Sequence, residues 1–442
     1  MERRSRAQGR LLPTWLRGLA LGLVVVNLLL AAYVVWRSAV LTPYYDDIDW
    51  IERWRNFRGD WLAYLFQPVN LHRAPMIFGL VAFDIEVLGG TNWPLIASGA
   101  AALAALAWML AQEAGKAAPP PLALPAVALT AMLALMGSNL LDAATPICVN
   151  YIHGVSFAVL AMVLADGGPD HGLSWRRMAA LAAAMAAALG DAAALAVWPV
   201  LGLSALRRRD WPWLAAVVAA GAAFIGAYAW GQGENARISA SGALAGPLSA
   251  LRLTLNFLPL PWTRANVQLA WIAGLAIGLL GVAAVALRGG CNASRSERIA
   301  ANFILFSLGV ALMAGIGRTS GDPLNVPLRY GVLLAPLHAG FLILVLPFAG
   351  ELWRANRRAA QALCAAVLAL ATVQNLILAD AAIRTNDKVR TIVADFRAGL
   401  RTEATPLFIH PHLDKAERAY AEMARDGIYQ RELHLKPDRS AR

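Results

Sequence analysis

Long uncharged stretches of apolar residues recur along most of this chain, and they restrict the folds that it can adopt. The first runs from Gly18 to Val40, and a transmembrane helix needs roughly 20 consecutive apolar residues. The chain of 442 residues is 58% hydrophobic and 15% charged, with a mean hydropathy of +0.52. Soluble domains carry about 25% charged residues. The sequence therefore predicts an all-α polytopic membrane protein.

Apolar runs of membrane-spanning character predict about eleven transmembrane helices. Besides the first run, they fall near residues 92–112, 121–138, 150–165, 178–190, 192–206, 211–230, 267–287, 299–316, 331–349 and 359–380. The first run is too long for the core of a cleavable signal peptide, and Trp36-Arg37 makes a poor cleavage site. We therefore expect a signal anchor. The two short runs at 178–206 are the weakest part of this interpretation, because a single span there would place Asp191 inside the membrane.

Basic residues cluster at alternate gaps between these runs, which predicts the orientation of the chain. They are Arg176-Arg177, Arg207-Arg208-Arg209, Arg288 with Arg295 and Arg298, and Arg354 with Arg357-Arg358. Cytoplasmic loops carry an excess of Lys and Arg. This accounts for the net charge of +11 without a nucleic-acid partner. We expect a bacterial inner-membrane protein with a cytoplasmic N-terminus and a periplasmic C-terminus.

The same topology predicts how the chain divides into parts. Residues 1–380 form the transmembrane domain, and residues 41–90 form an outward loop with interfacial helices. Residues 381–442 form a small periplasmic segment that is too short for a large core of its own and packs on the membrane domain. Further outward segments are expected near 231–266 and 317–330.

Three carboxylates lie close together in the first outward loop, at Asp46, Asp47 and Asp49. Pro43 precedes them, and acids at a helix start are favoured by the helix dipole. An ordinary acidic helix N-terminus is therefore one interpretation. The other is a site in which one of these carboxylates is a general base, while another holds a divalent metal or the acceptor sugar.

Positive charge on the outward side marks two further candidate segments. His72 and Arg73 lie in Asn70–Pro75, where they could bind a phosphate, pair with the aspartates or anchor the segment at the interface. Arg318 lies in a glycine-containing segment, and Arg329-Tyr330 follows it. Arginines on this side run against the positive-inside trend, so they indicate an anion site or a lipid-headgroup anchor.

Weaker signals come from isolated polar residues. Asp191 could cap a helix, Asp142 and His153 lie in apolar surroundings, and His410 and His412 form a lone pair in the tail. Three cysteines, Cys148, Cys291 and Cys364, are too far apart to indicate a disulfide framework or a CxxC metal site. The chain has no Walker A, GxSxG or HExxH motif. Nothing therefore predicts nucleotide binding.

The layout resembles the GT-C superfamily of membrane glycosyltransferases. It resembles poorly characterised bacterial multispanning members in particular, through Asn70–Pro75, Gly317-Arg318 and Leu328-Arg329-Tyr330. Those proteins show Glu-His-Arg and Ser-Arg-Tyr. This chain instead has Leu71 before His72-Arg73 and Leu328 before Arg329-Tyr330. The resemblance implies a polyprenyl-phosphate-linked sugar as donor, a glycan or lipid as acceptor, and Asp46 or Asp47 as catalytic base. It also implies substrate contacts at Asp49, His72, Arg73, Arg318, Arg329 and Tyr330.

Such an enzyme would be inverting and would use the arginines to stabilise the departing phosphate. Two other classes remain open on the sequence alone. A transporter or flippase for a lipid-linked or acidic solute would line its path with the same charges. A structural partner in envelope polysaccharide assembly would need no chemistry at all.

Overall fold

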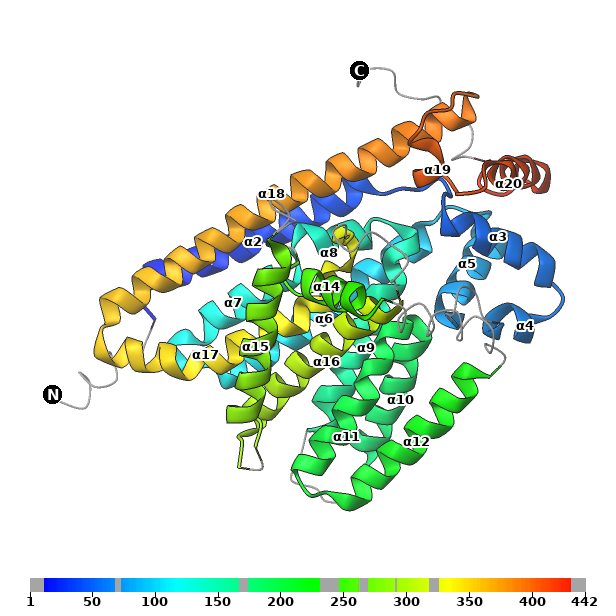
Figure 1. Cartoon of the computed structure of the whole chain (residues 1–442). Helices are drawn as coiled ribbons and strands as arrows, with labels where there is room; N and C mark the ends of the chain where they lie inside the picture. The colour runs from blue at the N-terminus through cyan, green and yellow to red at the C-terminus, as the bar shows by residue number, and fades with distance from the viewer. Residues whose placement is uncertain are drawn as a thin grey trace.

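The structure is a computed structural model, and it describes residues 12–67, 73–166, 174–230, 246–260, 262, 269–290, 292–317 and 326–430. Every regular element within these ranges is a helix (Figure 1). In chain order they are α2 Thr14–Ser38, α3 Asp46–Phe57, α4 Trp61–Phe66, α5 Pro75–Leu88, α6 Trp93–Ala117, η1 Pro120–Leu122, α7 Ala123–Ala134, α8 Gly137–Ala143, η2 Pro146–Cys148, α9 Val149–Ala165, α10 Trp175–Gly190, η3 Ala192–Ala196, α11 Val197–Arg207, α12 Trp211–Ala229, α14 Pro247–Phe257, α15 Ala270–Arg288, α16 Arg295–Gly317, η4 Leu328–Leu334, α17 Ala335–Ala355, α18 Arg357–Arg397, α19 Thr405–Phe408 and α20 Leu413–Asp426.

Eight helical segments in the described part of the chain are long and apolar enough to cross a membrane. They are α2, α6, η2–α9, α12, α15, α16, η4–α17 and α18. The segment η1–α7 with α8 makes a ninth if its 53° bend is counted as one broken span. A polytopic membrane protein is thus the class that the structure supports.

The expected number of about eleven spans is too high, and the difference lies mainly around Asp191. The runs at 178–190 and 192–206 do form separate helices that meet at Asp191, namely α10 and η3–α11. However, α10 has 16 residues, which rise roughly 24 Å, short of the roughly 30 Å hydrocarbon core. The segment 192–207 is also below the length of a span.

The fraction of each apolar helix that is buried inside the protein distinguishes central from peripheral helices. About two thirds of the apolar window in η2–α9, and 61% of those in α16 and η4–α17, is buried inside the protein, against 22% in α2, α12 and α15. Small residues allow the close packing of the central helices: Gly154 on α9 lies against the α10–η3 junction, where an added Cβ would come within 2.9 Å of the Asp191 Cβ. This is how membrane helices associate when lipid provides no hydrophobic driving force between them.

The first and last long helices, α2 and α18, run side by side along one flank (Figure 1). Asn375 on α18 donates a buried hydrogen bond to the Asn27 side chain on α2, with 2.6 Å between the heavy atoms. Helix α18 has 41 residues and continues through residue 380 without a break. The expected division of the chain at 380/381 therefore falls inside one helix.

Basic clusters from several loops come together at one end of the bundle. Asp166, after α9, pairs with Arg208 at 3.0 Å and with Arg298 at 3.0 Å. Glu113 on α6 pairs with Arg295 at 2.6 Å, and buried Arg177 pairs with Asp210 at 2.5 Å. The sequence predicted that these arginines share one side of the membrane, and they do lie at one end of the bundle.

A separate layer covers the other end. Helices α3, α4 and α5 pack there with α19 and α20 around a shared apolar cluster that includes Ile48, Trp54, Phe78 and Met423 (Figure 1). Helix α5 has 14 residues, which is short for a transmembrane span. The expectation that the C-terminal tail packs on the rest of the protein is met: the Tyr420 hydroxyl donates to the Pro43 carbonyl oxygen at 2.5 Å.

Candidate functional site

Asp47 lies in the first turn of α3 and is almost fully buried, with 3% of its surface exposed. The preceding Tyr45 has a φ of 53°, in the left-handed region that non-glycine residues seldom adopt. Asp47 Oδ2 accepts a long hydrogen bond, 3.4 Å, from the Tyr44 backbone N–H. Burial raises the pKa of Asp47 well above its ordinary value, and neighbouring Asp46 and Asp84 add to the rise. A buried carboxylate of raised pKa suits a general base better than a solvated helix start does.

Arg329 is the second residue of the short helix η4, which leads into α17. Its guanidinium lies over the Tyr330 ring at 5.6 Å. The Tyr330 ring in turn contacts Tyr151 at 5.2 Å and stacks on Phe257 at 5.7 Å. Arg329 Nε is buried and has no hydrogen-bond partner among the described residues. The aromatic contacts hold the backbone of η4 in place and leave this donor available.

The loop-one acids and Arg329 converge, although they are far apart in the sequence. Cys148 lies within electrostatic range of Asp46, Asp47 and Arg329. Tyr44, just before α3, is likewise influenced by Asp47 and Arg329, and burial raises its pKa well above the ordinary value. Asp46, Asp47 and Arg329, which the sequence singled out, thus share buried Cys148 as a neighbour.

Asp142 belongs to the same region, a relation that the sequence did not indicate. It lies on α8, fully buried, and is within electrostatic range of Arg329 and Cys148. His153, with which it was grouped, lies instead against Ser98 of α6. The available signal was an acid inside the long apolar stretch 121–165, which is costly in a membrane and therefore marks function.

Asp49 pairs with the C-terminal segment. It accepts from Lys415 Nζ at 2.5 Å and lies 3.4 Å from His410 Nε2, so it joins α3 to the C-terminal segment. His410 Nδ1 is occupied by the backbone of His412. The sequence-based interpretation of Asp49 as a substrate ligand receives no support from these contacts.

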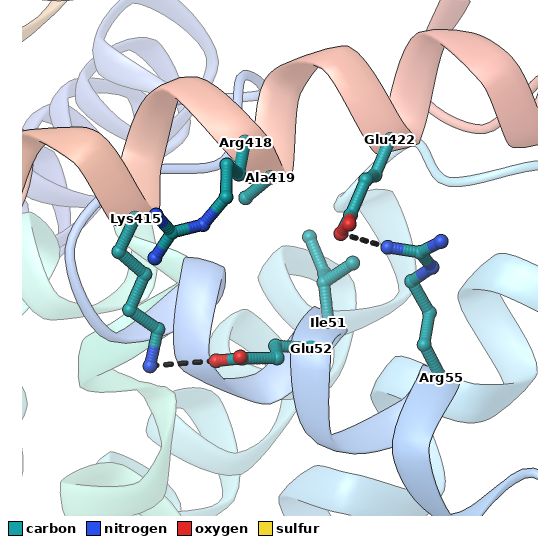
Figure 2. A pocket seen from close by; sticks show the side chains of 7 residues that line it. All are labelled: Ile51, Glu52, Arg55, Lys415, Arg418, Ala419 and Glu422. Carbon is teal, nitrogen blue, oxygen red and sulfur yellow. Dashed lines mark hydrogen bonds and ion pairs between the residues drawn. The ribbon is translucent and has the colours of Figure 1, made fainter.

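A small pocket of about 50 Å³ lies along the same α3–α20 interface (Figure 2). Its charged groups already pair across the interface: Lys415 with Glu52 at 2.6 Å, and Arg55 with Glu422. The pocket is lined by neither Asp47 nor Arg329. We regard it as a packing defect between two amphipathic helices and not as the site.

Arg73 is held entirely by the fold. Its backbone N–H donates to the Tyr228 hydroxyl at 3.1 Å and its Nε to the Tyr228 carbonyl at 2.9 Å, while its terminal nitrogens contact the carbonyls of Phe66 and Trp230. These hydrogen bonds attach the end of loop one to α12. They also occupy the guanidinium donors that a substrate would need. His72 and Arg318 lie outside the described residues.

No group of three His, Cys, Asp or Glu side chains close enough to hold a metal ion occurs within the described ranges. Comparison with known proteins adds no identity: no family model, no curated protein and no solved structure matches this chain. Asp46, Asp47, Asp142 and Arg329 remain as the candidate residues, and all four act electrostatically on buried Cys148.

Proposed function

We propose that this protein is an inverting glycosyltransferase that moves a sugar from a polyprenyl-phosphate-linked donor to a glycan or lipid acceptor. The observation that supports the proposal is the convergence of buried Asp47 with Arg329 around Cys148 and Tyr44. A base and a fixed cation in one water-poor region are what displacement of a phosphate leaving group requires.

In the proposed reaction, Asp47, or its neighbour Asp46, takes the proton of the acceptor hydroxyl. The hydroxyl oxygen forms a bond to the anomeric carbon as the bond from that carbon to the phosphate oxygen breaks. Polyprenyl phosphate leaves with the electron pair, and Arg329 stabilises its charge. Guanidinium groups suit this task because they carry a permanent charge and offer several donors in a fixed plane.

The proposed site faces the periplasm. The arginine-rich end with Asp166, Arg208 and Arg298 lies at the cytoplasm, and the α3–α5 layer with the C-terminal segment lies at the outer leaflet of the bacterial inner membrane. A lipid-linked donor would reach the site sideways from the bilayer. Exposed apolar residues on α4, namely Trp61, Leu62 and Phe66, suit contact with lipid.

A transporter of a lipid-linked or acidic solute is the second candidate. Asp142 favours it, because a buried acid in an otherwise apolar segment is also typical of a transport path. Chemical turnover distinguishes the two classes, since a transporter moves the lipid-linked sugar without cleaving it.

The test uses the purified full-length protein in liposomes with undecaprenyl-phosphate-linked sugars and an envelope fraction as acceptor. We expect release of undecaprenyl phosphate, and loss of that release in an Asp46→Asn, Asp47→Asn double variant. Asp60→Asn is the matched control, because Asp60 lies in the same loop and only caps α4. Unimpaired transfer by the double variant would reject the site, and movement without cleavage would favour the transporter.

A further inference from the structure

Asp84 and Asp142 are both fully buried, but they differ in their hydrogen bonding. Asp84 on α5 accepts from the Thr91 and Asn92 backbone N–H groups, the Thr91 hydroxyl and the Tyr429 hydroxyl, at 2.8–3.3 Å. Both carboxylate oxygens of Asp142 are buried, and neither has a hydrogen-bond partner in the described part of the chain. The Cys148 thiol, a weak donor, is the neighbour closest to providing one. Buried polar groups normally find partners, so the exception at Asp142 calls for an explanation.

Arg329, which acts electrostatically on Asp142, also has a buried polar atom without a partner among the described residues, its Nε. Helix α8 packs closely on η4: a Cβ added to Gly331 would lie 2.8 Å from the Ser138 Oγ and 3.2 Å from the Asn139 Oδ1. Asp142 follows those two residues by four and three positions, so it lies on the same side of α8. Arg329, at the start of η4, is within electrostatic range of it, yet the two form no ion pair.

An unpaired carboxylate and an unpaired guanidinium nitrogen, both buried, are unfavourable unless a third group connects them. That group must donate to Asp142 and accept from Arg329 Nε. A sugar hydroxyl is such a donor and a phosphate oxygen is such an acceptor. A sugar phosphodiester carries a hydroxyl donor and a phosphate acceptor in one headgroup, whereas a polyprenyl phosphate without its sugar has no sugar hydroxyl.

We propose that Asp142 and Arg329 form a headgroup subsite in which Asp142 accepts a hydrogen bond from a hydroxyl of the donor sugar and Arg329 binds the adjoining phosphate. The inference rests on the proposed function, because it assigns the substrate headgroup of that same site. It makes Asp142 a substrate-binding residue that selects lipid phosphates carrying a sugar.

The subsite predicts an unusual combination of effects for substitutions of Asp142. Both carboxylate oxygens of Asp142 are buried without a hydrogen-bond partner in the described part of the chain, which is costly, so Asp142→Leu and Asp142→Asn should raise the unfolding temperature of the ligand-free protein. The same changes should weaken binding of the headgroup. Asp84→Leu is the control for burial, and it should lower the unfolding temperature because it removes an acceptor that four donors share.

Calorimetric titration of the full-length protein in nanodiscs provides the binding measurement. The probes are farnesyl phosphoryl-glucose, -mannose and -galactose, with farnesyl methyl phosphate as a phosphodiester of equal charge that has no sugar hydroxyls. We expect the wild type to bind at least one sugar probe about tenfold more tightly than the methyl diester. Both Asp142 variants should lose this preference and keep their affinity for the methyl diester, whereas Arg329→Lys should weaken every probe.

The outcomes separate this inference from the proposed function. Equal affinity of the wild type for all four probes overturns the subsite but leaves phosphate binding at Arg329 in place. Equal loss of all probes in the Asp142 variants, or a lowered unfolding temperature, assigns Asp142 a structural role and also overturns it. If no probe binds the wild type, both the subsite and the proposed donor class are wrong.

Discussion

The backbone N–H of Tyr45 donates a 2.6 Å hydrogen bond to the carbonyl oxygen of Ile409. Tyr45 is the residue before α3, so the C-terminal segment holds the start of the helix that carries Asp47. The strained φ of Tyr45 is maintained by contacts from the far end of the chain. The segment after α18 thus supports the candidate site by holding the start of α3.

Asp47→Asn should abolish most of the transfer activity while the protein stays folded. A neutral amide cannot accept the proton of the acceptor hydroxyl, so turnover should fall by at least about a hundredfold. Release of polyprenyl phosphate in liposomes measures the effect, and Asp60→Asn should retain full activity. If Asp47→Asn keeps more than a tenth of the activity, Asp47 is not the base and Asp46 takes its place as the candidate.

The same substitution should change how stability depends on pH. Because the pKa of Asp47 is raised in the folded protein, the folded state binds the proton more tightly than the unfolded state. Stability is therefore lost as pH rises from the ordinary Asp value through the raised folded value. Unfolding temperatures measured from low to neutral pH should decline in the wild type. The decline should be smaller in Asp47→Asn, which should be the more stable protein at neutral pH. Parallel curves for the two proteins would contradict the burial of an ionisable Asp47.

Arg329→Lys should weaken phosphate binding more than it weakens the fold. Lysine keeps the charge but loses the planar set of donors, including the unpaired Nε, so affinity for farnesyl methyl phosphate should fall by about tenfold or more. Arg384→Lys serves as the control, because Arg384 forms only an exposed pair with Asp380 on α18. Unchanged affinity in Arg329→Lys would move the phosphate site elsewhere.

Asp49→Asn should have a mild effect that appears in stability before it appears in activity. Its carboxylate pairs with Lys415 across a partly exposed interface, and such pairs contribute at most about 1 kcal/mol. Chemical denaturation measures the loss, which Lys415→Met should reproduce and which the double variant should not double. A loss of turnover in Asp49→Asn as large as that in Asp47→Asn would show that Asp49 acts on the substrate after all.

The orientation of the chain can be checked by labelling with a membrane-impermeant maleimide. Cysteines placed at the exposed positions Arg58 and Leu407 should react from the periplasmic side, and a cysteine at exposed Arg176 should react only after the membrane is opened. The unmodified protein gives the background from its natural cysteines. Opposite accessibility of positions 58 and 407 would contradict the arrangement of loop one beside the C-terminal segment.

Local features of the sequence were sufficient for the class of the protein. The length of the apolar runs predicted membrane helices, because a span depends on the composition of one continuous segment. Arginine placement predicted which loops share a side, and Asp166 indeed joins Arg208 to Arg298. The span count was not predicted correctly, since Asp191 divides a stretch whose two halves are each too short.

Tertiary structure alone decided the use of each polar residue. Asp47 and Asp49 are two positions apart on α3. Asp47 is buried, whereas Asp49 pairs with Lys415. Arg73 and Arg329 looked equivalent, but carbonyls of α12 and neighbouring segments occupy Arg73 while Arg329 Nε keeps no partner among the described residues. These outcomes depend on which helix faces meet across long sequence separations. Hydropathy and charge spacing record only the chain near each residue, so packing of distant helices determines which charges are satisfied and which remain for chemistry.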